Sequence, residues 1–209
     1  LVNALDYGVP QERERIILFG VKYQKIDADR KNALRKLKNN FKFGKKEKYS
    51  IIHRKECNWP ETSPFRENSN LAKPENIIDE LSIQYWFDKN DVCHHYNAVD
   101  FFQPRSRERF ETIEEGDVSK KSFKRLHRWR YSPTAAYGNN EVHLHPYRVR
   151  RISVAEALAI QSLPKEYIIS KELSKSDMFK TIGNGVPFLM AKGIAKAIYD
   201  FLDTYYDEE

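Results

Sequence analysis

Three polar side chains near the start of the sequence have the types and the spacing to act together in chemistry. Gln11, Arg13 and Arg15 alternate within the stretch NALDYGVPQERERIILFG, residues 3–20. Side chains at this spacing point to one face if the chain is extended, because successive residues of a strand alternate between faces. A fixed guanidinium donates paired hydrogen bonds and stabilises negative charge on a bound molecule. The spacing predicts a binding or catalytic cluster, and the alternative is two surface arginines paired with the intervening glutamates.

The residues on either side of this cluster predict the elements that would position it. Gly8 and Pro10 favour a turn immediately before it. The apolar run at residues 16–19 is typical of a buried strand, which would end at Gly20. We therefore expect the cluster to lie between a tight turn and a strand.

A second set of candidate residues lies in a basic tract at residues 120–130. Aromatic residues stand between its lysines and arginines. Cations bind phosphate groups, and aromatic rings can stack on bases. The mixture favours contact with nucleic acid over an ordinary solvated face. The candidates for that contact are Lys124, Arg125, Arg128 and Arg130.

Composition limits the class of protein. The chain has 209 residues, a net charge of +6 and a pI near 9.1, which suits an anionic partner. Its apolar runs are far shorter than the roughly 20 residues of a membrane-spanning helix, and its first residues lack the layout of a signal peptide. Cys57 and Cys93 make no disulfide framework, and CHH at residues 93–95 has no second ligand pair at zinc-finger spacing. We expect a cytoplasmic protein with no metal site and no contact with a membrane.

The last third of the sequence carries the clearest helix signals. Ser153 followed by Glu156 forms a capping box and predicts a helix over residues 154–162. A Gly-Asn-Gly turn at residues 183–185 precedes a second predicted helix, over residues 187–202.

Three stretches resemble sequence blocks of the cytosine-5 DNA methyltransferases. NALDYGVPQERERIILFG contains the Q-x-R-x-R core of their block eight, RRISVAEALAIQSLP resembles block nine, and IGNGVPFLMAKGIAKAI resembles block ten. The tract SPTAA, followed by LHP, is similar to the stretch that leaves the family's target-recognition region. These blocks occur in the family's order, so the chain resembles the C-terminal half of such an enzyme.

The resemblance implies a reaction and a set of roles. Family members flip the target cytosine out of the duplex, add a cysteine thiolate to ring carbon six and transfer a methyl group from S-adenosylmethionine to carbon five. By this resemblance Arg15 would reach the cytosine carbonyl, Arg13 would contact phosphate or brace the site, and Gln11 would orient this cluster. Thr134 would lie near the target phosphate. The residues expected near S-adenosylmethionine are Gly183, Asn184 and Gly185.

The chain departs from the family pattern in what it lacks. Neither cysteine lies in a Pro-Cys-Gln loop, and no glycine-rich first loop for the cofactor is present. Glu75 in PENI is similar to the block of the catalytic glutamate, but it follows block eight, whereas the family places that block before it. We therefore expect the chain alone to be inactive and to need the missing N-terminal half as a partner. Its start at Leu1 favours a cut-out of a longer enzyme over a natural subunit of a split methyltransferase.

Two other functions stay open at the level of the sequence. The chain could be a non-catalytic DNA-binding subunit of a split enzyme, or part of an RNA cytosine-5 methyltransferase of the same fold. The expected role in a restriction-modification system, with double-stranded DNA as partner in a bacterial cytoplasm, rests on the resemblance.

The expected fold is α/β in two lobes. Residues 1–22 and 150–209 would form the last strands and closing helices of a Rossmann-like methyltransferase lobe, which would hold part of the S-adenosylmethionine site. Residues 23–149 would form a smaller, irregular α+β target-recognition lobe, with an amphipathic helix over residues 27–40. Open sheet edges on the first lobe would favour a homodimer.

Overall fold

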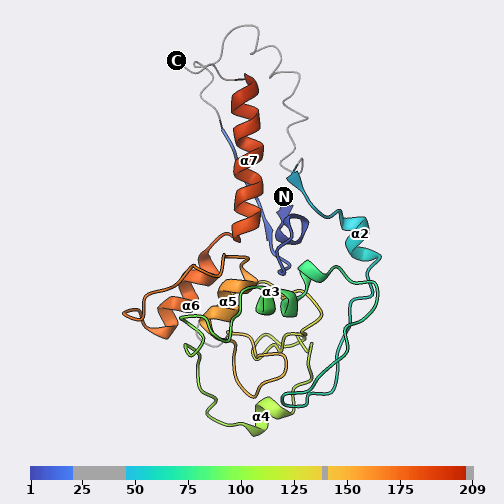
Figure 1. Ribbon diagram of the computed structural model, residues 1–209, viewed down its shortest axis with the longest axis vertical. Helices are drawn as coiled ribbons and strands as arrows, with labels where there is room; N and C mark the ends of the chain where they lie inside the picture. The colour runs from blue at the N-terminus through green and yellow to red at the C-terminus, as the bar shows by residue number, and fades with distance from the viewer. Residues whose placement is uncertain (21–45, 138–140, 206–209) are drawn as a thin grey trace.

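The computed structural model of the chain describes residues 1–20, 46–137 and 141–205 (Figure 1). The predicted helix over residues 27–40 lies outside this described part. The long helix α7 (Phe188–Tyr205) stands at one end of the molecule, and a loop-rich part that carries α4 (Glu108–Glu111) forms the other end (Figure 1).

The N-terminal segment contains a short 3-10 helix that is capped at both ends. β1 (Val2–Asn3) leads into the 3-10 helix η1 (Ala4–Tyr7), and the Asn3 side chain accepts a hydrogen bond from the first turn of η1. Gly8 ends η1 with a φ of 83°, a left-handed conformation that glycine adopts readily. The chain then returns as β2 (Glu14–Arg15), antiparallel to β1. The predicted turn before the polar cluster is confirmed.

Residues 16–19 do not form the buried strand that the sequence predicts. Ile16 is 75% exposed and Leu18 is 91% exposed, and β2 ends before them. Only the alternate side chains are covered, because Ile17 packs against the apolar cluster beside α7 and Phe19 lies edge-on to a phenylalanine ring of that helix. A continuous apolar run is typical of a strand buried on both faces, whereas here one helix covers one face.

The capping box produces the helix that it predicts. In α5 (Val154–Ile160) the Ser153 hydroxyl accepts a hydrogen bond from the Glu156 N–H, and the Glu156 carboxylate accepts one from the Ser153 N–H. Every residue of α5 is buried, so the helix is a central element of the core. The predicted helix over residues 187–202 is confirmed as α7.

A further helix, α6 (Lys175–Asn184), stands between these two and is not among the predicted elements. Its N-cap is Ser174, whose hydroxyl accepts a hydrogen bond from the Asp177 N–H at 3.2 Å. Gly183 and Asn184 belong to the last turn of α6, and Gly185 caps it with an ordinary φ of −64°. The prediction of a free Gly-Asn-Gly turn is therefore wrong, since these residues form a helix C-terminus.

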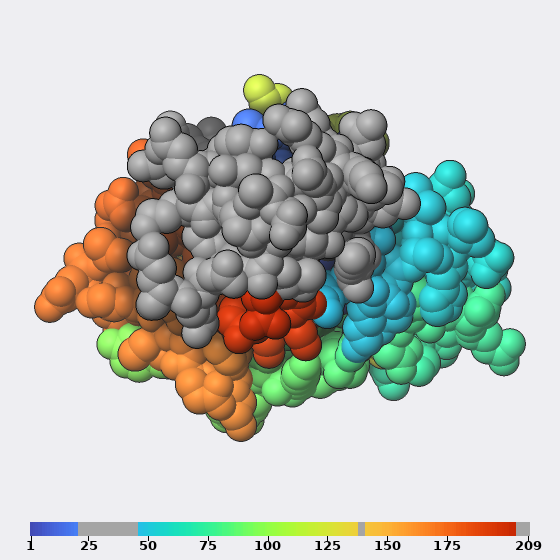
Figure 2. All heavy atoms as spheres, turned by 90° about the horizontal axis from the view of Figure 1, so that it is seen from above, coloured from blue at the N-terminus to red at the C-terminus, as the bar shows by residue number. Residues whose placement is uncertain are grey.

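The middle of the chain contains short helices joined by loops. These helices are α2 (Ile51–Lys55), η4 (Asp79–Leu81), α3 (Ile83–Lys89) and α4. Seen from the α7 end, the segment that carries α2 and the segment that carries α6 lie on opposite sides of the molecule (Figure 2). Within the described part, the sheet of β1 and β2 is the one sheet present.

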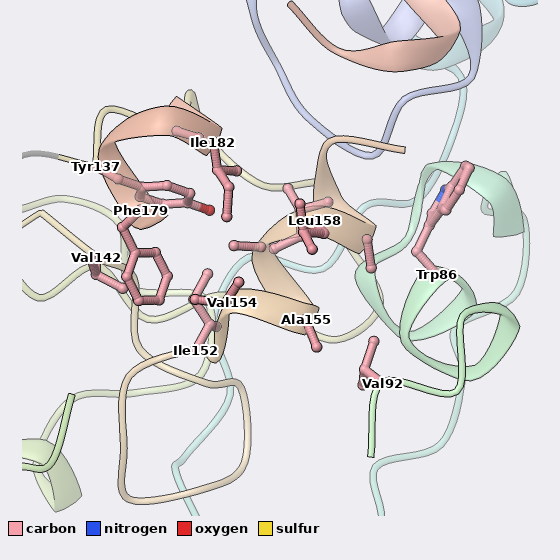
Figure 3. Close-up of a cluster of buried hydrophobic side chains, with 14 of the residues drawn as sticks. Trp86, Val92, Tyr137, Val142, Ile152, Val154, Ala155, Leu158, Phe179 and Ile182 are labelled. Carbon is pink, nitrogen blue, oxygen red and sulfur yellow. The ribbon is translucent and has the colours of Figure 1, made fainter. Parts of the chain in front are cut away.

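The largest hydrophobic core joins α3, α5 and α6. Trp86 of α3, Leu158 of α5 and Phe179 of α6 are each at most 3% exposed and belong to one cluster (Figure 3). Tyr137 closes the cluster next to Phe179, with their rings edge-on at 5.6 Å. This core draws side chains from both predicted lobes, and the division of the chain into two lobes stays a prediction.

Candidate functional site

Arg13 connects three segments that are far apart in the sequence. Its Nη1 donates to the carbonyl oxygen of Ala135 at 3.0 Å, and its Nη2 donates to those of Gly183 at 2.9 Å and Gly185 at 3.2 Å. The side chain is 3% exposed. A single guanidinium thus holds the polar cluster, the segment after the basic tract and the end of α6 together.

The environment of Arg13 fits a structural brace. Burial lowers the pKa of Arg13 to about 10, and the neighbouring charge of Arg15 acts in the same direction. The guanidinium is therefore still protonated at neutral pH. Since it is buried and bonded to three carbonyls, its geometry agrees with the bracing role and leaves little room for contact with a phosphate.

Arg15 lies in a different environment, although it is only two residues away. Its side chain is partly exposed at the end of β2, and its Nη1 donates to the carbonyl oxygen of Glu14 at 2.6 Å. The expected common face of three side chains does not form, because Gln11 and Arg13 are buried whereas Arg15 reaches the surface.

Residues 10–13 run beside residues 132–135. Gln11 forms a parallel bridge with Ser132, and the Glu12 N–H donates to the Ser132 carbonyl at 2.8 Å. The Thr134 hydroxyl donates to the Glu12 carbonyl at 2.7 Å. The structure therefore brings together two groups of predicted site residues, the polar cluster and Thr134, that are separated by more than a hundred residues in sequence.

Gln11 is the most deeply buried member of the cluster. The side chain is fully buried, and neither its Nε2 nor its Oε1 has a hydrogen-bond partner among the residues that the structure describes. A buried amide without partners destabilises the folded state by about 1–3 kcal/mol. Such a residue is typical of a site that is arranged for function and less well satisfied than the rest of the core.

The residues predicted near the cofactor line a hollow of about 390 Å³. Gly183 and Asn184 form one side of it, and Tyr137 and Phe179 contribute aromatic rings. A Cβ at position 183 would lie 3.1 Å from the Tyr137 backbone nitrogen, so the close approach of the two chain segments favours glycine there. Gly185 does not line this hollow, and its carbonyl accepts a hydrogen bond from Arg13.

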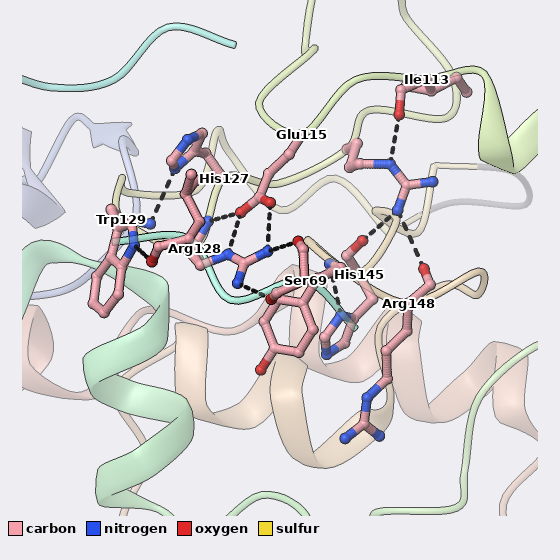
Figure 4. A network of polar contacts seen from close by, with 11 residues as sticks. Ser69, Ile113, Glu115, His127, Arg128, Trp129, His145 and Arg148 are labelled. Atoms are coloured by element: carbon pink, nitrogen blue, oxygen red, sulfur yellow. Dashed lines mark hydrogen bonds and ion pairs between the residues drawn. The ribbon is translucent and has the colours of Figure 1, made fainter. Parts of the chain in front are cut away.

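Arg125 lies in the interior, contrary to its predicted role as a DNA contact. It is fully buried, and its guanidinium donates to the carbonyls of Ile113 at 2.8 Å and Arg148 at 3.2 Å (Figure 4). It also bonds the carbonyls of Phe110 and His145. Burial lowers its pKa to about 10. Arg125 therefore links several loops through hydrogen bonds from its side chain to their backbone carbonyls.

Arg128 is also buried, and it is paired with a carboxylate. Its Nε and Nη2 donate to the two oxygens of Glu115, each at 2.8 Å, and its Nη1 donates to the Ser69 carbonyl at 2.6 Å (Figure 4). Glu115 is 2% exposed and Arg128 is 4% exposed. A two-point ion pair in the interior is structural, so the position of Arg128 also contradicts the predicted DNA contact.

The other two basic candidates remain at the surface. Lys124 and Arg130 are partly exposed, and Arg130 donates to the Pro60 carbonyl at 3.3 Å.

The sequence interpretation did not single out the buried charges of Glu115, Arg150 and Glu156. Arg150 forms a two-point ion pair with Glu156, at 2.9 and 2.6 Å. The sequence predicted the capping role of Glu156, but nothing in it distinguished Arg150, its ion-pair partner, from the other basic residues.

No metal site or membrane helix is visible in the described ranges. Three or more His, Cys, Asp or Glu side chains do not come together there in a way that could hold a metal ion. In the same ranges no helix has the length and apolar character to cross a membrane.

Comparison with known proteins places this architecture in a family. The family model of C-5 cytosine-specific DNA methylases matches residues 1–200. The chain belongs to this family. Across nearly the whole chain it is 54% identical to the type II methyltransferase M.NmeDI of Neisseria meningitidis serogroup C, of which it covers 46%. It is 24% identical to the type II methylase M.HgiDII of Herpetosiphon aurantiacus and covers 57% of that protein.

A solved structure supports the fold. A crystal structure described as a DNA modification methyltransferase encoded within an E. coli prophage superposes with a TM-score of 0.52 at 21% identity. The match covers 97% of this chain and 59% of the solved chain. The chain therefore has a methyltransferase fold, and it spans about half the length of the curated relatives it matches.

Proposed function

We propose that this chain is part of a type II DNA (cytosine-5-)-methyltransferase of a restriction-modification system. In this role it recognises a specific duplex sequence and helps to hold the flipped cytosine while a methyl group is transferred from S-adenosylmethionine. The observation that carries the proposal is the brace at Arg13, which joins the segment of Arg15 to Ala135 and to the end of α6, while Thr134 bonds the neighbouring Glu12 carbonyl. The family match over residues 1–200 supports it.

The proposed roles of the polar cluster come from its resemblance to the family's block eight, and the burial of each residue supports them. Arg15 is the member whose guanidinium reaches the surface, so it is assigned to the cytosine carbonyl, where a cation stabilises charge developing on the ring. Arg13 holds the segment in place through its hydrogen bonds to the carbonyls of Ala135 and Gly183. Gln11 is assigned to orienting this cluster, with its buried amide left free to bond a group that binds there, and Thr134 is assigned to the phosphate beside the target.

The hollow beside Asn184 is the proposed edge of the cofactor site. Its volume of about 390 Å³ lies within the range of small-molecule sites, and its lining combines aromatic rings with the polar side chains of Asn184 and Asp177. Rings can pack on the adenine of S-adenosylmethionine, and a carboxylate can bind its amino group. When bound, the cofactor supplies the methyl group, while these residues position it.

The chain is proposed to work together with the remaining part of a longer enzyme. Ile16 and Leu18 present an uncovered apolar edge beside β2, next to the partly exposed Arg15. An uncovered edge of this kind is a natural place for further strands to add. We assign it to the part of the enzyme that carries the nucleophilic cysteine, so the chain alone does not transfer methyl groups.

Complementation tests this proposal. The 209-residue chain is mixed with a polypeptide made of the part of M.NmeDI that the chain does not match, and incorporation of labelled methyl groups from S-adenosylmethionine is measured. We expect methylation of duplex DNA in the mixture and none with either part alone. Methylation of transfer RNA in place of DNA, or methylation by the chain by itself, would contradict the proposal.

A further inference from the structure

A second hollow, which the proposed function does not use, is strongly basic. It has a volume of about 540 Å³ and lies beside α4. Its lining includes three arginines, Arg105, Arg109 and Arg151, and three phenylalanines, Phe102, Phe110 and Phe123. We call these six residues and the space between them the arginine pocket. None of the described residues that line it carries a carboxylate.

The three guanidiniums of the arginine pocket have no acidic partner in the described part of the chain, where their neighbour Arg107 has two. Arg107 bonds Glu67 at 3.0 Å and lies 3.6 Å from Glu111. No ion pair of this kind joins a described carboxylate to Arg105, Arg109 or Arg151. Three like charges around one space repel one another, and an anion bound between them would offset that repulsion.

Aromatic rings pack against two of the three arginines, Arg109 and Arg151. The Arg109 guanidinium lies over the Phe123 ring at 4.3 Å, and that of Arg151 lies 5.5 Å from the Phe102 ring and 5.6 Å from the Phe123 ring. Phe123 is held in a left-handed conformation with a φ of 61°, which is unusual for an aromatic residue. Its ring packs on Phe110 at 5.7 Å. The packed rings therefore give this side of the pocket a defined shape, with Arg109 and Arg151 against them.

The electrostatics of Arg151 agree with this arrangement. The side chain is half-buried, and burial together with the charge of Arg105 lowers its pKa from the ordinary value. A bound anion would relieve both effects. S-adenosylmethionine is a poor fit here, because its sulfonium and amino groups are positive and would face three further cations.

We propose that the arginine pocket binds the phosphodiester backbone of the DNA substrate. Guanidiniums bind phosphate oxygens with two parallel hydrogen bonds, and the phenylalanine rings pack against the sugar or an adjacent base. Phe102 lines both this pocket and the hollow beside Asn184, so the bound strand passes next to the proposed methyl-transfer site. The inference rests on the proposed function in taking DNA as the substrate.

Binding of a fluorescein-labelled 30-base-pair duplex to the 209-residue chain tests the pocket, measured by anisotropy at several salt concentrations. The test variant is Arg105→Gln with Arg109→Gln, because both side chains are exposed and their removal should not unfold the chain. We expect affinity to fall by roughly tenfold. The slope of log K against log salt should shrink by about 0.9 for each phosphate that the variant no longer neutralises. Arg151→Gln should act in the same direction.

Arg107→Gln is the matched control, since it removes an exposed arginine from the same segment that is already paired with carboxylates. We expect its affinity to stay within about twofold of the wild type, because the Arg107 charge is already paired with two carboxylates and is outside the pocket. If the double variant kept wild-type affinity and slope, or if Arg107→Gln weakened binding equally, the arginine pocket would not be the phosphate-binding site. DNA binding by the chain, which the proposed function requires, would be unaffected by that result. If the wild-type chain did not bind duplex DNA, the DNA recognition in the proposed function would fail as well.

Discussion

The Nη2 atom of Arg13 donates to the carbonyl oxygen of Gly183 at 2.9 Å, across 170 residues of sequence. The same guanidinium also holds Ala135 and Gly185. A planar group with several fixed donors can serve three carbonyls at once, which a lysine ammonium cannot do with the same geometry. The contact explains how segments from both ends of the chain and from its middle are held together.

Replacing Arg13 should destabilise the protein, whereas replacing Arg15 should not. Arg13→Ala removes the donor from the buried Ala135 carbonyl and from the two part-buried carbonyls of Gly183 and Gly185, so we expect the free energy of unfolding to fall by about 2–4 kcal/mol. Arg15→Ala, at a partly exposed position, should change it by less than about 0.5 kcal/mol. Urea unfolding followed by tryptophan fluorescence measures both. Equal decreases for the two variants would contradict the bracing role of Arg13.

Arg15→Ala should instead remove catalysis. In the complementation assay with the unmatched part of M.NmeDI, we expect methylation to fall by at least about a hundredfold, the size of effect seen when one donor to a developing oxyanion is removed. Duplex binding should stay nearly unchanged, because one arginine is removed from a chain with many cations. Arg15→Lys serves as the control for charge. Methylation at the wild-type level in Arg15→Ala would refute the assigned role.

Breaking the ion pair of Arg128 and Glu115 should cost more than replacing both partners. Glu115→Gln leaves a buried guanidinium without its counter-charge, and we expect a decrease of about 3–5 kcal/mol in the free energy of unfolding. The double variant Arg128→Met with Glu115→Leu should recover much of that stability, since no charge is then left buried. A double-mutant cycle of Arg128→Met, Glu115→Leu and the double variant, measured by urea unfolding, gives the coupling. If the double variant were as unstable as the sum of the single variants, the pair would not act as a unit.

The protein should lose stability as the pH falls below about 6.5, the ordinary pKa of histidine. Burial lowers the pKa of His127 to about 4 and that of His143 to about 3, so both imidazoles are neutral in the folded state. The unfolded chain binds their protons below pH 6.5, and each histidine therefore removes up to ~1.4 kcal/mol of stability per pH unit until its folded pKa is reached.

Thermal unfolding at pH 7.5, 6.0 and 5.0 measures this slope. In the folded protein the backbone N–H of Trp129 donates to His127 Nδ1 at 3.1 Å. His127→Asn keeps an acceptor for this N–H but does not titrate, so stability should fall less steeply with pH. The carboxylate of Glu156 adds to the destabilisation at still lower pH, because its contacts with His145 and Arg150 hold its pKa below the usual range. A midpoint that did not change between pH 7.5 and 5.0 would show that the buried histidines are not linked to folding.

Gly193 should not tolerate a side chain. It lies in α7 against Tyr7 of η1, and a Cβ there would stand 2.7 Å from the Tyr7 Cε1 atom. Alanine is favoured over glycine in a helix by about 1 kcal/mol, but overpacking a buried contact costs about 1–3 kcal/mol or more, so we expect Gly193→Ala to be destabilising. Combining it with Tyr7→Leu should remove most of the penalty. Calorimetry of the two single variants and the double variant decides whether the ring is the obstacle.

Local signals in the sequence predicted the elements that depend on local interactions. The capping box at Ser153 and Glu156 predicted α5, and the apolar periodicity after residue 187 predicted α7. The same kind of signal, Ser174 followed by Asp177, marks the start of α6, but the Gly-Asn-Gly at its end was interpreted as a loop. A helix that ends in glycines looks like a turn when its N-cap is overlooked.

The positions of the arginines could not be predicted because their partners are distant. Arg125 and Arg128 stand in a run of charge, which is typical of a solvated face, but the carbonyls and the carboxylate that bury them come from Ile113, Glu115 and Arg148. No periodicity reports which loops will deliver those oxygens. The family blocks pointed to the segment of Arg13, yet only the fold separates a buried Arg13 from a partly exposed Arg15.

The docking of η1 against α7 has a consequence for biosynthesis. Tyr7 leaves the ribosome long before Gly193 exists, and at about 5–20 residues per second the interval is on the order of 10–40 s. Throughout it the apolar side chains of the N-terminal segment, Val2, Ala4 and Val9, lack the helix that buries them in the finished protein. The nascent segment therefore keeps these side chains exposed until α7 has been synthesised and can cover them.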